Sequence, residues 1–342
     1  MGLRILHSAD WHLGAAFSGF SPEQRQQLIR SQRQLPGRMA DLVRAHGCHL
    51  VLLAGDLFDV PCPKGEWVQI LQDALARMKV PVFISPGNHD YCCPGSPWLE
   101  ESWPENVHIF TGGLTPVDLP QLDCRIWGAG YQSMDCPPLL EGFRAEGPQR
   151  YKIGLLHGTC MQPNSPYCPI SAQQIASVAL DLLALGHIHK GGILRKTATL
   201  CAWPGCPMGR GWDETGEKGL FLVDLGEKTP EVTPIFLDTP TFYDLEAEET
   251  SLSRILPPAG NDNFYRITLI GDRKTDIREI RENLSHFPNL TLIDTRETPE
   301  DLWKDAGEDT LRGEYFRLLR EQNALLTAEI SRKLLQGKEV NL

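Results

Sequence analysis

Residues 50–59 read Leu-Val-Leu-Leu-Ala-Gly-Asp-Leu-Phe-Asp, an apolar run that ends in Gly55 and Asp56. Near-continuous apolar character is typical of a strand that is covered on both faces. A glycine and then an aspartate at the end of such a strand let the carboxylate project beyond the sheet, where it can bridge two cations. The same aspartate could also cap a helix or occupy a turn. The stretch therefore predicts an α/β fold with a candidate metal ligand at a strand end.

Four further motifs in the first 190 residues place polar side chains at the ends of apolar runs. They are Asp10-Trp11-His12, Gly87-Asn88-His89-Asp90, His157-Gly158 and Gly186-His187-Ile188-His189. Each motif alone has an ordinary explanation as a turn, a polar strand end or a buried core histidine. Together, in this order, they supply enough oxygen and imidazole ligands for two divalent cations, which indicates metal-assisted cleavage of a phosphate ester.

The spacing within two motifs suggests which side chains act together. Asp10 and His12 are two positions apart, and His187 and His189 repeat that spacing. In extended backbone, side chains at positions i and i+2 point the same way, so both members of a pair can reach one metal.

The Gly87–Asp90 motif separates a ligand from a catalytic group. Adjacent residues seldom bind the same ion from one side, so we assign Asn88 as a ligand through its amide oxygen and His89 as a catalytic group. Asp90 is then expected to be structural. A simple turn remains the alternative, because Gly, Asn and Asp all favour turns.

The pattern of apolar runs predicts a parallel sheet followed by other elements. We expect strands at residues 3–8, 50–54, 80–85, 107–111, 125–128, 153–156 and 182–185, and helices at 21–45, 66–78 and 171–180, the first of them broken or kinked at Pro36. From about residue 193, strands at 197–202, 219–225 and 233–237 follow without helices. They suggest a second, more antiparallel sheet that packs on the first.

The C-terminal part indicates a smaller domain. Residues 241–263 contain prolines and an acidic run and are typical of a linker. A strand at 264–270, a helix at 276–287 and a strand at 290–294 form a compact βαβ unit, and a final helix covers 310–335. We therefore expect a domain at 1–240, a linker at 241–263 and a cap at 264–342.

Composition limits the class of protein. The chain has 342 residues, a net charge of −11 and ten cysteines. It contains neither a long apolar span nor a signal-peptide pattern, so we expect a cytoplasmic protein that does not enter a membrane, with reduced thiols. The negative charge gives no global attraction to nucleic acid, but bound dications and local basic patches can still hold phosphates.

The five motifs in this order resemble those of the calcineurin-like metallophosphoesterases. More narrowly, the chain resembles the SbcD-type DNA repair exonucleases, especially the YhaO-like branch. That likeness depends on residues 7–14, on 55–59, on Pro204-Gly205 with the loop 214–219, and on the βαβ unit. The resemblance implies a four-layer α/β/β/α sandwich with a small C-terminal α/β cap and a terminal helix.

The resemblance also implies the ligand sets. Metal one would be bound by Asp10, His12, Asp56 and His189, and metal two by Asp56, Asn88, His157 and His187. This mixed donor set suits Mn²⁺, with Mg²⁺ or iron as alternatives. His89 would stabilise or protonate the leaving oxygen, and Asp59 would orient His89, although Asp59 could equally be a capping residue.

The function that the resemblance implies is hydrolysis of DNA phosphodiester bonds in DNA repair by an exonuclease that uses two metal ions. The alternatives are a small-substrate phosphodiesterase or nucleotide phosphohydrolase on the same site, and a noncatalytic scaffold. Arg210 and Lys218 could meet substrate phosphates or be solvated loop charges, and Trp67, Val68 and Leu71 could form a homodimer face or pack in the core. Relatives act with an SMC-like ATPase bound through C-terminal helices. One terminal helix is expected here, so the sequence leaves that partner open.

Overall fold

The computed structural model describes residues 2–195, 198–226, 229–257, 259–260, 262–297 and 302–337. Two compact units are present. The larger comprises Met1–Asp244, Ala259–Arg266 and Phe287–Leu290, and the smaller comprises Leu245–Pro258, Ile267–His286 and Thr291–Leu342. Within the described residues, no helix combines the length and apolar character needed to cross a bilayer.

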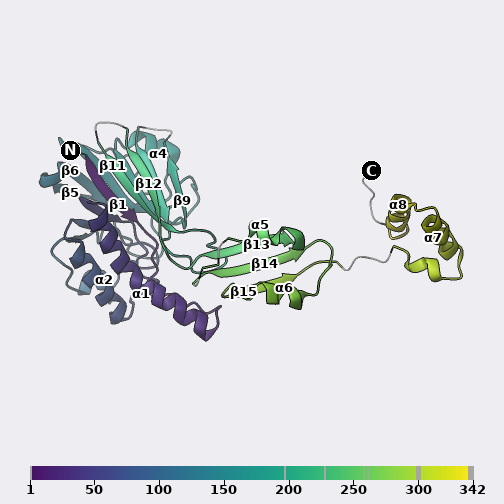
Figure 1. Cartoon of the computed structure of the whole chain (residues 1–342). Helices are drawn as coiled ribbons and strands as arrows, with labels where there is room; N and C mark the ends of the chain where they lie inside the picture. Colours follow the sequence, from purple (N-terminus) through teal and green to yellow (C-terminus); the bar gives the residue numbers. More distant parts are fainter. Residues whose placement is uncertain are drawn as a thin grey trace. The chain divides into compact units, whose positions relative to one another are not determined.

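The larger unit contains two six-stranded sheets (Figure 1). The first has the order β12-β11-β1-β2-β3-β4, with β1 Leu3–Ser8, β2 Leu50–Leu53, β3 Val82–Ile84, β4 Val107–Ile109, β11 Gly219–Leu225 and β12 Glu231–Phe236. The second has the order β5-β6-β7-β8-β10-β9, with β5 Thr115–Leu119, β6 Cys124–Gly128, β7 Tyr151–His157, β8 Leu182–Gly186, β9 Lys190–Leu194 and β10 Leu200–Gly205. Strands β1 to β4 are parallel, and so are β6, β7, β8 and β10.

Three apolar layers hold this unit together. Side chains such as Ile5, Leu52 and Ile153 fill the space between the sheets. Helices α1 (Pro22–Ala45) and α2 (Gly65–Met78) cover the outer face of the first sheet, and α4 (Ala172–Ser177) packs on the second. The expected four-layer α/β/β/α fold is therefore confirmed. The face of α2 formed by Trp67, Val68 and Leu71 is buried in the core. This burial favours core packing over a homodimer face for these residues.

The strands after residue 193 do not form a sheet of their own, so that prediction was wrong. Strand β11 pairs antiparallel with β1, whereas β10 pairs parallel with β8. The two hairpins β9–β10 and β11–β12 thus extend different sheets. Strand β9 was not predicted, because Gly191 and Gly192 interrupt its apolar pattern.

Helix α1 runs through Pro36 without the expected break. Ser21 and Gln24 form the predicted capping box at its start. Pro36 lies on the buried face beside Leu35 and Met39, and packing of this face compensates for the hydrogen bond that proline cannot donate.

The region 241–263 is not a linker. It contains β13 (Phe242–Glu248) and the short α5 (Leu252–Ile255), and β13 joins β14 (Phe264–Ile270) and β15 (Leu290–Asp294) in a third sheet. Phe242 is fully buried, and its ring stacks on Phe264 with 4.7 Å between centroids. Helix α6 (Ile277–Asn283) lies between β14 and β15 in the chain, as expected.

The terminal segment forms two helices rather than one. Helix α7 covers Leu311–Glu321 and α8 covers Leu325–Leu335. The break falls at Asn323, whose φ is +54°, a backbone conformation that asparagine adopts more readily than most residues. The expectation of a single terminal helix over 310–335 was therefore wrong.

Asp90 joins the loops that follow β2 and β3. Its buried carboxylate accepts hydrogen bonds from the backbone N–H groups of Gly87 at 2.7 Å and Leu57 at 2.8 Å, and also from those of Asp56 and Phe58. A single side chain therefore fixes two loops from neighbouring strands, which supports the structural role expected for it.

We expect Asp90→Asn to lower the free energy of unfolding by about 1–3 kcal/mol, because an amide cannot accept all of these N–H groups. Urea unfolding in EDTA measures the change. The control is Asp73→Asn on the exposed face of α2, expected to shift stability by less than about 0.5 kcal/mol. Equal unfolding midpoints for the two variants would contradict the role of Asp90.

Candidate metal centre

The predicted site residues gather at the carboxyl ends of five parallel strands. Asp10 follows β1, Asp56 follows β2 and Asn88 follows β3, all in the first sheet. His157 ends β7 and His187 follows β8 in the second sheet. The strand ends of the two sheets meet, because Nδ1 of His157 lies 2.7 Å from the Ala54 carbonyl and the backbone N–H of His187 donates to Asp10 at 3.0 Å.

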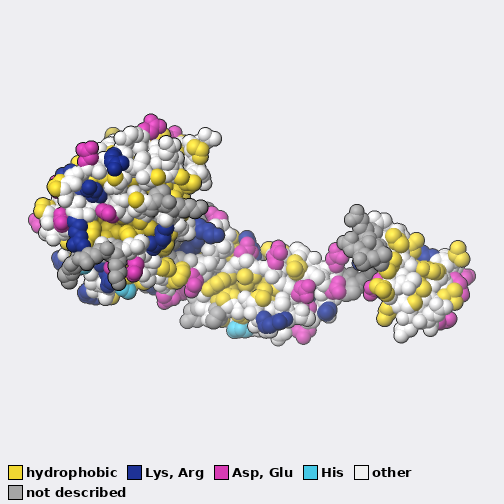
Figure 2. All heavy atoms as spheres, turned by 90° about the horizontal axis from the view of Figure 1, so that it is seen from above, with side chains coloured by type: hydrophobic (Ala, Val, Ile, Leu, Met, Phe, Trp, Pro, Cys, Tyr) yellow, Lys and Arg dark blue, Asp and Glu magenta, His cyan; other side chains and the backbone are white. Residues whose placement is uncertain are grey.

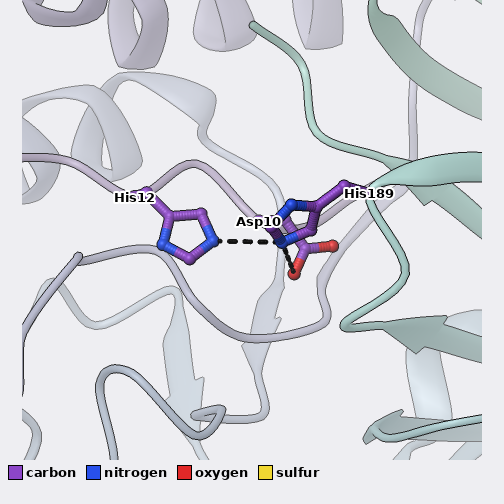
Figure 3. A group of neighbouring side chains, drawn as sticks. All are labelled: Asp10, His12 and His189. Carbon is purple, nitrogen blue, oxygen red and sulfur yellow. Dashed lines mark hydrogen bonds and ion pairs between the residues drawn. The ribbon is translucent and has the colours of Figure 1, made fainter. Parts of the chain in front are cut away.

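One group of donors consists of Asp10, His12 and His189 (Figure 3). The Nε2 atoms of His12 and His189 are 3.3 Å apart, and the Nε2 atom of His189 is 3.9 Å from Oδ1 of Asp10. Oδ2 of Asp56 is 3.8 Å from Nε2 of His12. Two imidazole nitrogens and carboxylate oxygens thus face the same small volume.

A second group consists of Asp56, His157 and His187, with Asn88 between them. The amide oxygen of Asn88 is 2.9 Å from Nε2 of His157 and 2.9 Å from Nδ1 of His187. Oδ2 of Asp56 is 3.4 Å from Nε2 of His157. Asp56 therefore borders both groups, as the resemblance implies.

The backbone at this site departs from the extended geometry that the spacing suggested. Asp10, His12, Asp56 and His187 have φ values of 56°, 46°, 51° and 85°. Left-handed conformations at residues other than glycine cost free energy and concentrate at functional sites. The extended-backbone argument was therefore wrong for Asp10 and His12, although the two side chains do share a group. It was also wrong for His187 and His189, which belong to different groups.

The electrostatics suit cations. Burial raises the pKa of Asp10. Burial opposes both charges of the Asp56–His157 pair, but the attraction between the two charged groups is stronger. This attraction raises the pKa of His157 to about 9 and lowers the pKa of Asp56 below its ordinary value. In this arrangement protons on imidazole balance the buried carboxylates, and divalent cations could replace them. The donors therefore fit two divalent metal ions.

Three of the histidines are held by hydrogen bonds on the ring nitrogen that faces away from the donors. Nδ1 of His157 donates to the Ala54 carbonyl at 2.7 Å, and Nδ1 of His12 lies 3.1 Å from Oδ1 of Asp59. Nδ1 of His189 lies 2.6 Å from Oε1 of the buried Glu214. Such contacts fix the ring and increase its basicity as a metal ligand.

Glu214 is the site residue that the sequence did not reveal. Burial opposes its charge, but hydrogen bonds from His189 and Arg210 keep its pKa below the ordinary value. Arg210 binds Glu214 at 2.6 Å and lies 3.4 Å from Asp59, so it belongs to this network. Glu214 belongs to a loop that the resemblance had marked, but spacing alone gave no sign that it meets His189.

The expected role of Asp59 needs correction. Its carboxylate contacts His12 and Arg210, whereas His89 is held through the backbone: Nδ1 of His89 donates to the Asp59 carbonyl oxygen at 3.2 Å. The His89 backbone N–H donates to Oδ1 of Asp56 at 2.8 Å. The ring of His89 also lies within reach of His12 and Asp56, so it borders the first group.

Comparisons with known proteins agree with this geometry. A model of the calcineurin-like phosphoesterase family matches residues 3–191. "Uncharacterized metallophosphoesterase YhaO" of Bacillus subtilis (strain 168) is 32% identical over 237 residues, and the match covers 65% of this chain and 57% of that relative. The chain thus spans little more than half of the relative's length.

The solved structures that match are more distant in sequence. A dimetal phosphatase from Danio rerio is 13% identical with a TM-score of 0.48, and the match covers 68% of this chain and 95% of that one. An archaeal phosphodiesterase is 15% identical with a TM-score of 0.38, and the match covers 69% of this chain and 100% of that one.

The family match includes all seven predicted metal ligands and covers more than half of the 342 residues. The chain therefore belongs to the calcineurin-like phosphoesterase family.

Proposed function

We propose that the protein is a nuclease that hydrolyses DNA phosphodiester bonds, acts as an exonuclease in DNA repair and uses two manganese ions. The observation that carries the hydrolytic activity is the pair of donor groups that Asp56 borders, with His89 close to both His12 and Asp56. The SbcD-type features favour DNA as the substrate: the Trp11 motif, the loop 214–219 and the C-terminal cap with its helical pair.

The protein's own residues would divide the work. When bound, the metal ions would neutralise the phosphate oxygens and lower the pKa of the attacking water. In its doubly protonated form, His89 would keep one proton on Nδ1, which donates to the Asp59 carbonyl, and would give the proton on Nε2 to the leaving oxygen. Asn88, His157 and His187 would hold one ion, while Asp10, His12 and His189 would hold the other.

The helical pair α7–α8 supports the further proposal of an SMC-like ATPase partner. It exposes apolar side chains in the smaller unit, and Figure 2 shows them grouped over this part of the chain. Leu311 is 90% exposed, Leu326 68% and Leu334 63%. Contiguous exposed apolar surface is typical of protein–protein contact sites.

We expect His89→Ala to retain both metal ions while its turnover of bis-p-nitrophenyl phosphate falls by about 100- to 10,000-fold, because a proton donor is lost but no ligand is. Elemental analysis after gel filtration measures the metal content. Loss of metal together with activity would show that His89 is a ligand instead.

For Glu214→Gln we expect the affinity for manganese to fall about 10- to 100-fold, because the amide holds His189 less firmly. Titration calorimetry measures the affinity, and excess manganese should restore turnover, unlike in His89→Ala. Glu105→Gln, at an exposed site, is the matched control. Unchanged affinity in Glu214→Gln would remove Glu214 from the metal site.

The substrate proposal is tested with end-labelled linear DNA. With manganese, the wild type should shorten the DNA and also cleave bis-p-nitrophenyl phosphate, and EDTA should stop both reactions. His89→Ala, purified in parallel, excludes a contaminating nuclease. Cleavage of the reporter without cleavage of DNA would support the small-substrate enzyme, and cleavage of neither would support the noncatalytic scaffold.

A further inference from the structure

A crevice of about 670 Å³ opens beside the metal centre in the larger unit. It lies between the loop 213–219 and strands β9 and β12, which are the edge strands of the two sheets. Its walls include Ile193 from β9, Phe221 from β11, and Ile235 and Phe236 from β12. The β9–β10 hairpin extends one sheet and the β11–β12 hairpin extends the other. The crevice therefore lies between the edge strands β9 and β12.

The crevice is continuous with the metal centre. His189, a donor of the first group, and Glu214, which holds His189, both line it. The side chain of His189 is 30% exposed, whereas those of Asp10 and His12 are buried. A substrate phosphate at the first donor group would therefore have one of its substituents beside the mouth of the crevice.

The lining indicates what kind of substituent fits. Phe236 is 59% exposed and Ile193 40% exposed, so an aromatic ring and an aliphatic side chain are both available to a ligand. Lys190 and Lys218 line the crevice, but so do Asp213 and Glu217. With Glu214, which also lines the crevice, the acidic side chains outnumber the two lysines, so the crevice does not suit a run of phosphates. An apolar space with a few polar groups suits a single planar, partly polar ring system.

We propose that this crevice binds the nucleoside attached to the scissile phosphate, with its base against Phe236. This inference rests on the proposed phosphodiesterase function and deepens it, because it makes the enzyme prefer diesters of nucleosides. Stacking of a base on an aromatic side chain is sequence-tolerant, so the crevice would accept any of the four bases. Its volume lies within the range of about 300–1,000 Å³ usual for ligand sites.

The test compares two chromogenic diesters with manganese: thymidine 5′-p-nitrophenyl phosphate and methyl p-nitrophenyl phosphate. The wild type should have the higher kcat/KM for the nucleoside diester. Phe236→Ala should lower the ratio of the two values by roughly 5- to 150-fold, which corresponds to the loss of one stacked base. Ile193→Trp, which fills the crevice from the opposite wall, should lower the ratio as well.

Leu99→Ala is the matched control, since Leu99 is also a half-exposed apolar residue of the larger unit but lies on α3 (Pro97–Glu100). Its ratio should remain that of the wild type. A ratio that is unchanged in both crevice variants, or that falls equally in Leu99→Ala, would overturn the proposal.

Binding gives a second readout that does not depend on turnover. Fluorescence of 2-aminopurine deoxyriboside 5′-monophosphate in EDTA should be quenched saturably by the wild type and several-fold more weakly by Phe236→Ala. Equal quenching by the wild type and Phe236→Ala would contradict binding of the base against Phe236.

The two proposals fail separately. Preference for the nucleoside diester without cleavage of linear DNA would overturn the nuclease function and leave the crevice supported. Cleavage of DNA with no effect of Phe236→Ala on the ratio would overturn only the crevice.

Discussion

Burying the carboxylates of Asp10 and Asp56 in one site costs free energy, and much of the surrounding structure offsets that cost. Burial raises the pKa of Asp10, and the nearby charge of Asp56 raises it further. Imidazoles from both sheets balance these charges, and the backbone N–H of His187 donates to both oxygens of Asp10. The left-handed backbone at Asp10, His12, Asp56 and His187 persists because the buried strands before them are fixed by packing on both faces.

The sequence predicted the donors better than their geometry. Strand-end residues such as Asp56 and His157 follow long apolar runs, so their position at a sheet edge could be inferred from pattern alone. The left-handed turns could not, because positive φ is uncommon at any residue other than glycine and the pattern of apolar residues carries no sign of φ. Glu214 was missed for another reason: its meeting with His189 depends on how β10 and β11 return to different sheets.

The same separation of hairpins explains why the strands after residue 193 were wrongly expected to form a sheet of their own. A run such as Gly219–Leu225 predicts a strand, but it does not say which of two available sheet edges the strand will join. The pairing of β11 with β1 and of β10 with β8 is a choice between tertiary partners. Phe242 shows a similar limit, because its burial against Phe264 outweighs the prolines and acids that made the region resemble a linker.

The distribution of the donors over both sheets links metal supply to the persistence of the folded protein. Asp10 and His187, whose contact joins the sheets, are 177 positions apart in the chain. Cations held by donors of both sheets bind only when the sandwich is closed, so their binding free energy adds to the stability of the whole larger unit. Cells poor in the metal would then lose the protein itself to unfolding and proteolysis, and not only its activity.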